Sequence, residues 1–136
     1  EILDDAGVVR ISMGQDPKDT HRRSRACGIT FRELEGDERG GMGTMDDLSA
    51  VIALDAPHGV GGPMPDRIGM KVDADGSAGL ILIDNQMRVP VQLVADAQGG
   101  GGLELFAYDD DKKVGQKKRV TFAGEAVSEF PLDAGK

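Results

Sequence analysis

Short apolar runs alternate with polar turns between residues 67 and 111. The turns begin at four aspartates that are 11, 12 and 13 residues apart: Asp73, Asp84, Asp96 and Asp109. This spacing fits a strand of five or six residues followed by a turn of similar length. Asp is favoured at the first position of a type I turn and Gly at the fourth, which is the arrangement in residues 73–76. The segment therefore predicts successive antiparallel hairpins.

Alternating apolar and polar residues predict further strands outside this segment. Residues 9–13 and 27–31 each have one apolar face, whereas residues 48–54 are apolar on both faces. A strand with two apolar faces is typical of the inside of a sandwich or of a contact with another subunit. Residues 80–83 have the same character, which places them near the centre of the sheet. We expect residues 35–47 to be turn-rich and residues 112–119 to form a polar connection before a last strand at 119–123.

These elements predict an all-β fold, an antiparallel hairpin meander that forms a sandwich or a flattened barrel. The alternative is a β-solenoid of stacked hairpin rungs. A chain of 136 residues is long enough for one domain with a core, so residues 1–136 are expected to form a single β-rich domain. Val127, Phe130 and Leu132 stand among polar residues near the C-terminus, and residues 125–136 are therefore a candidate docking tail.

Composition excludes several classes of partner. The net charge of −8 and the pI near 4.7 disfavour binding to nucleic acid, whose phosphates an acidic protein repels. The longest apolar run, residues 78–83, is far shorter than a membrane helix, so any membrane contact would require an upstream anchor or a partner. The single cysteine, Cys27, excludes an intramolecular disulfide and is expected to be a small buried hydrophobe.

No motif proposes a catalytic reaction, so we expect neither an enzyme nor a bound cofactor. Ser77 lacks the first glycine of a nucleophile elbow, and His21 and His58 lie in loops without further zinc ligands. Calcium is the one metal with candidate ligands, at four turn aspartates: Asp73, Asp75, Asp109 and Asp111. They do not have the spacing of an EF-hand loop, and they form a weak alternative that requires turns on one edge of the sheet.

Aromatic residues supply the candidate interface. If Leu103 and Leu105 face a core, then Phe106 and Tyr108 stand side by side on the outer face, in a chain with five aromatic residues. Exposed aromatic pairs often mark contacts with a protein partner or within a homo-oligomer. We expect Phe106, Tyr108 and Phe130 to form such an interface, although a strand with both faces covered fits the same pattern.

Two segments resemble a group of uncharacterised bacterial proteins. The opening segment carries Asp4, Gly7 and Arg10 in an Asp-x-x-Gly-x-x-Arg turn and strand. The second carries five matching residues: Phe31, Gly36, Glu38, Gly40 and Gly41. The expected glycine is absent from residues 84–87 and 109–112. The resemblance implies a β-rich domain, often behind an N-terminal export or anchor segment, and it implies no activity.

The sequence therefore predicts a non-catalytic structural or accessory subunit that mediates protein–protein contacts in a larger, membrane-associated assembly. A small-ligand or calcium-binding β-module is the alternative. The resemblance and the start at Glu1 without a methionine predict an extracytoplasmic location on the periplasmic side, with an anchor or signal peptide upstream. A cytoplasmic location is the alternative.

Overall fold

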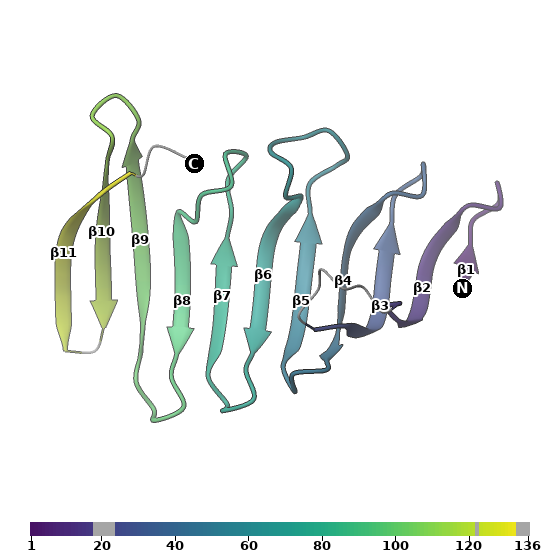
Figure 1. Cartoon of the computed structure of the whole chain (residues 1–136), viewed down its shortest axis with the longest axis horizontal. Coiled ribbons are helices and arrows are strands. Elements are labelled where there is room, and N and C mark those ends of the chain that lie inside the picture. Colours follow the sequence, from purple (N-terminus) through teal and green to yellow (C-terminus); the bar gives the residue numbers. More distant parts are fainter. Residues whose placement is uncertain (18–23, 122, 133–136) are drawn as a thin grey trace.

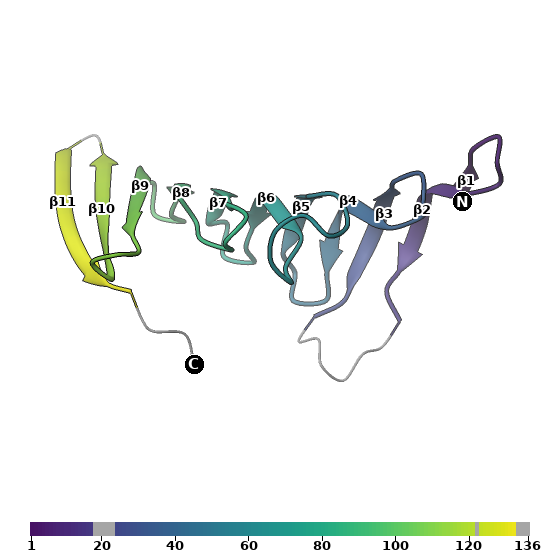
Figure 2. The same ribbon diagram turned by 90° about the horizontal axis from the view of Figure 1, so that it is seen from above.

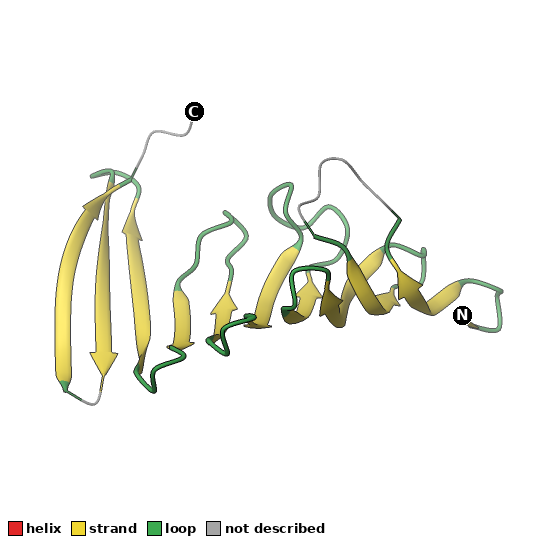
Figure 3. Cartoon of the chain, turned by 60° about the horizontal axis from the view of Figure 1, so that its bottom comes forward, coloured by secondary structure: helices red, strands yellow, loops and turns green. Residues whose placement is uncertain are grey.

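All regular structure in the computed structural model is β-strand, within the residues that it describes, 1–17, 24–121 and 123–132 (Figure 3). None of these residues forms a helix that could cross a membrane. The strands are β1 (Ile2–Leu3), β2 (Val9–Gln15), β3 (Ala26–Arg32), β4 (Glu38–Met45), β5 (Ala50–Asp55), β6 (Asp66–Val72), β7 (Ala78–Leu82), β8 (Val91–Ala95), β9 (Gly101–Asp109), β10 (Val114–Thr121) and β11 (Gly124–Pro131).

The strands lie in the sheet in the order in which they occur in the chain, from β1 at one edge to β11 at the other (Figure 1). Each strand is antiparallel to its neighbours, which confirms the all-β antiparallel hairpin meander. The sheet is open: it does not close into the flattened barrel, and the described strands form neither the second layer of a sandwich nor the rungs of a solenoid. The barrel does not close because β1 and β11, at the two ends of this order, do not pair with each other, and all described strands belong to this one sheet.

Six hairpin turns among the described residues share one hydrogen-bond pattern. The N–H of the first residue donates to the carbonyl of the fifth, and the N–H of the fourth donates to the carbonyl of the first. The fourth residue has φ between 62° and 91°, which identifies a type I turn followed by a bulge in the left-handed conformation. The turns begin at Asp4, Glu33, Met45, Asp73, Asp84 and Asp96.

Aspartate at the first position of these turns has the predicted role. The Oδ1 atoms of Asp4, Asp84 and Asp96 each accept hydrogen bonds from the N–H groups two and four residues later, at 2.8–3.0 Å. The N–H of Val8 holds the pKa of Asp4 below its ordinary value. The turn at Asp84 forms even though Met87, with φ 62°, occupies the position that normally belongs to glycine.

Two strands occur where the sequence predicted connections. Residues 112–119 were predicted to be a polar connection, which is wrong, because residues 114–121 form β10 between β9 and β11. Lys117 of β10 stands opposite Phe106 of β9, and its Nζ lies 5.5 Å from the Phe106 ring centroid and 2.7 Å from Glu104 Oε1 on the same face. The turn-rich reading of residues 35–47 is also wrong over β4, whose glycines conceal the strand pattern.

Most of the expected docking tail, residues 125–136, belongs to a strand. Its residues 125–131 lie in β11 and pair with β10, which makes them part of the last strand of the same sheet. Residues 133–136 of that tail lie outside the described residues.

Replacing Leu48 with Gly is expected to stabilise the protein by about 0.5–1 kcal/mol, since a non-glycine residue in the left-handed conformation is strained. Leu48 has φ 68° and its side chain is 81% exposed, so the substitution loses little packing. Urea denaturation measures the change. Leu48→Ala is the matched control, because alanine keeps the strain while removing the exposed side chain. An equal gain in both variants would show that backbone strain is not the cause.

Candidate interaction surface

The strand register places one uninterrupted row of apolar side chains across the sheet. Residues directly opposite each other on paired strands lie on the same face, and successive residues alternate between faces. Following the pairs from β2 to β9 gives the first apolar row: Met13, Ile29, Met42, Ile52, Met70, Leu80, Leu93 and Leu103. Val120 of β10 continues it. Each strand contributes one member, so the row exists only in the folded sheet.

A second apolar row runs beside the first on the same face. Its members from β2 to β9 are Ile11, Phe31, Gly40, Leu54, Ile68, Leu82, Val91 and Leu105. Neither row contains a charged residue before β10, where Lys118 stands opposite Leu105. We call these two rows together the apolar face.

The apolar face is uncovered. The described strands form a single layer when seen from above (Figure 2), and Ala56 and Ile83 are the only buried hydrophobic residues among the described residues. Met70 is 44% exposed and Leu93 is 51% exposed, although both stand in the middle of the sheet. A shallow hollow of about 530 Å³ lies between them. Apolar patches of this extent on a soluble protein usually mark a contact surface.

The opposite face has a different character because glycines occupy many of its positions. We call it the glycine face, and its glycines are Gly14, Gly28, Gly41, Gly43, Gly69, Gly79, Gly102 and Gly115. A Cβ atom on Gly28 would overlap the carbonyl oxygen of Met42 on the neighbouring strand, so β3 and β4 approach each other there only without a side chain. The buried Glu104 on this face pairs with Lys117 and Arg119, at 2.7 and 3.7 Å.

The three aromatic residues expected at an interface lie together on the glycine face, at its β9–β11 end. The Phe130 ring contacts the rings of Phe106 and Tyr108 edge to face, with centroids 6.1 and 6.2 Å apart. A Cβ atom on Gly115 would overlap the Phe130 ring, so this glycine opens the space in which the ring lies. The rings are half-buried by one another. Their contact with a partner stays a prediction.

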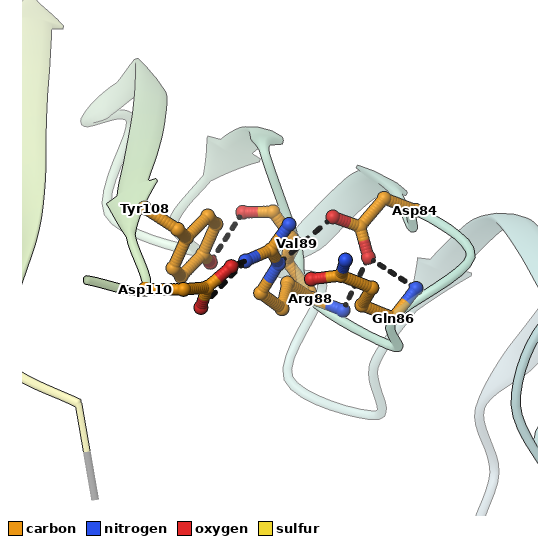
Figure 4. A network of polar contacts seen from close by, with 6 residues as sticks. All are labelled: Asp84, Gln86, Arg88, Val89, Tyr108 and Asp110. Atoms are coloured by element: carbon orange, nitrogen blue, oxygen red, sulfur yellow. Dashed lines mark hydrogen bonds and ion pairs between the residues drawn. The ribbon is translucent and has the colours of Figure 1, made fainter. Parts of the chain in front are cut away.

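An arginine joins this aromatic cluster to the turn between β7 and β8 (Figure 4). The Arg88 guanidinium lies 4.7 Å from the Tyr108 ring centroid and pairs with Asp84 at 2.9 Å and with Asp110 at 3.0 Å. The Tyr108 hydroxyl donates to the Val89 carbonyl at 3.1 Å. Partial burial raises the pKa of Asp84, whereas hydrogen bonds from Arg88 and Gln86 lower it. The lowering is the larger effect, so the pKa of Asp84 lies below its ordinary value.

The aspartates considered for calcium are not brought together. Asp73 and Asp75 belong to the turn between β6 and β7, whereas Asp109 ends β9 and Asp111 lies in the turn that follows it, at the opposite ends of the strands (Figure 1). One strand length, about 20 Å, separates the two positions. Asp73 pairs with Lys71, Asp75 accepts from Ser77, and Asp109 pairs with Lys112. No cluster of three His, Cys, Asp or Glu residues in the described part of the chain could hold a metal.

The other candidates for chemistry are also apart. Cys27 was expected to be buried, which is wrong: it is exposed on the side of the sheet that carries the apolar face, because no second layer covers that side. His58 stands near Asp37, with 3.7 Å between Nδ1 and the carboxylate, and His21 lies outside the described residues. Ser77 bonds to Asp75 within its own turn.

No protein-family model matches the chain, and no curated protein sequence matches it.

The apolar face was missed in the sequence because its residues were assigned to a core. Leu103 and Leu105 were expected to be covered, and Phe106 and Tyr108 to be the exposed residues. In the structure the leucines lie on the uncovered face, and the aromatic rings pack against one another. The one available signal was the pair of strands that are apolar on both faces, because such a strand also fits a contact with another subunit.

Replacing Phe130 with Ala is expected to cost about 1–2 kcal/mol, roughly half the effect of truncating a core aromatic residue, since the ring is half-buried. The loss should loosen β11 in particular, which amide hydrogen exchange over residues 124–131 detects. Val127→Ala is the control on the same strand, because Val127 lies on the opposite face and is 68% exposed. If both variants cost the same, the aromatic cluster does not hold this strand.

Replacing Asp84 with Asn is expected to cost about 1 kcal/mol near neutral pH, through the weakened bonds to Arg88. A carboxyl whose pKa is lowered by folding adds stability above its unfolded pKa, and this contribution is lost as the pH falls through the folded pKa. The difference between wild type and variant should therefore shrink below the ordinary pKa of 3.8. Denaturation curves across this pH range measure it, with Asp5→Asn as the control. A pH-independent difference would contradict the ionic origin.

Proposed function

We propose that this chain is a non-catalytic structural or accessory subunit that mediates protein–protein contacts, and that it does so through the apolar face. The observation that carries the proposal is the pair of charge-free apolar rows, which extend from β2 to β9 and are covered by none of the described residues. Exposed apolar area of this kind is unfavourable in water, and burial against a partner removes it.

The arrangement of charge supports a protein partner for this face. The chain has a net charge of −8, yet its charged residues are absent from both rows as far as β9. An interface core is typically depleted of charged residues and surrounded by a polar rim. Here the turns at both strand ends provide that rim, with Asp4, Asp84 and Asp96 among them.

Three methionines suit the apolar face to a contact surface. Met13, Met42 and Met70 occupy alternate strands of the first row. Methionine side chains are unbranched and polarisable, so they adapt to the shape of a partner. The aromatic cluster at β9–β11 extends the candidate surface to the other side of the sheet, but its rings already contact one another.

A module that binds a small apolar ligand is the second candidate. The hollow of about 530 Å³ on the apolar face falls within the usual size range of ligand pockets. It is shallow and open, whereas such pockets normally enclose most of the ligand. The larger assembly, its association with a membrane and an extracytoplasmic location stay predictions.

A photo-crosslinking side chain at position 93 of the intact protein, in its native host, tests the proposed function. Leu93 belongs to the apolar face and its neighbour Val94 to the glycine face, so position 94 provides the matched control. We expect a defined protein adduct from position 93 but not from position 94. The adduct should also disappear when Leu80→Glu places a charge in the same row. Equal adducts from both positions, or none from either, would refute a contact through the apolar face.

A further inference from the structure

We propose that the occupant of the apolar face is a second copy of the same chain, packed face to face, so that two open sheets form one two-layered sandwich. This inference rests on the proposed function and names the partner. It requires that the size, shape and chemistry of the apolar face fit another such face, and the register of the strands allows each of these to be assessed.

The extent of the apolar face matches what a stable dimer buries. Its rows cross eight strands, and at about 4.8 Å between strands the face is about 38 Å wide. Two rows with their flanking small residues give a height of about 18 Å. Each copy would therefore bury about 700 Å², and the pair about 1,400 Å². Specific protein–protein interfaces typically bury about 1,200–2,000 Å² in total.

The shape of the face favours a sheet over a helix as the partner. A single α-helix with its side chains is about 10–12 Å across, so it would leave part of the two rows in contact with water. A second sheet of the same extent covers both rows. Sheets share one hand of twist, and two sheets with the same twist pack with their strands about 30° apart. A second copy satisfies this condition without any change in the chain.

The chemistry of the face is self-complementary. In a two-fold dimer the same patch of each copy forms the interface, so charges of one sign in that patch would repel the same charges of the other copy. From β2 to β9 neither row has a charged residue. The charges begin on β10 and β11, where Lys118 and Glu125 stand on this face at the end of the rows. A small residue, Ala50, Ala78 or Ala95, flanks the first row on each of three central strands, which leaves room for close packing.

Sedimentation of the purified intact protein tests this inference, over about 1–100 μM and at physiological ionic strength. The wild type should sediment as a dimer. Leu93→Glu should weaken the association at least about 100-fold, because each copy of a two-fold dimer would bury an unpaired charge in the interface. Val94→Glu introduces the same charge on the glycine face of the same strand, and should change the association by less than about threefold.

Met70→Lys provides a second disruption of the first row if Leu93→Glu fails to fold, and it should have the same effect. A wild-type protein that remains monomeric throughout would overturn the second-copy inference. A dimer that neither Leu93→Glu nor Met70→Lys disrupts would also overturn it, since its contact would lie elsewhere, for example along β11. A monomer whose position 93 still crosslinks to a different protein would overturn the dimer and leave the proposed function standing. A monomer that crosslinks to no protein would overturn both.

Discussion

A sheet has two faces, and the sheet of this protein covers neither of them, because β1 and β11 do not pair and the described strands form one open layer. The apolar side chains of β2 to β9 gather on one face, yet the described residues provide no second layer. Burial of apolar area is the main favourable term in folding, and in this single open layer it is incomplete. Contact with another molecule would bury the two rows.

The turns keep the rows aligned. A shift of one residue in any hairpin would move the apolar side chains of one strand to the opposite face. Within the described part of the chain, six hairpins use the same bulged type I turn, with a fixed pair of backbone hydrogen bonds and a left-handed fourth residue. Because this turn fixes the register of the two strands that it joins, repeating it transmits the alignment along the sheet. The apolar face is in this sense a product of turn chemistry as much as of the apolar residues themselves.

The two faces of the sheet have different structural roles. Glycines on one face allow close approach of neighbouring strands, as at Gly28, and make room for the Phe130 ring at Gly115. The aromatic cluster and the Arg88 network stabilise the β9–β11 end. There β11 is an edge strand that pairs only with β10, and its Phe130 ring adds contacts with Phe106 and Tyr108 of β9. Charged residues on β10 and β11 end the apolar rows. This limits the part of the sheet that is open to apolar contacts.

The strand class, the hairpin order and the turn chemistry could be predicted from the sequence, because alternation and Asp-initiated turns are local properties. Strands β4 and β10 were not predicted. The glycines of β4 and the lysines of β10 conceal the alternation, and these segments are strands because of their neighbours: β3 approaches the bare backbone of β4, and Glu104 and Phe106 hold Lys117. The sequence analysis also did not place the aspartates of separate turns at opposite ends of the strands, since that position depends on the direction of each strand. Alternation shows only that a strand has an apolar face. Whether that face is covered depends on the number of layers, which is a property of the three-dimensional fold and not of any one strand.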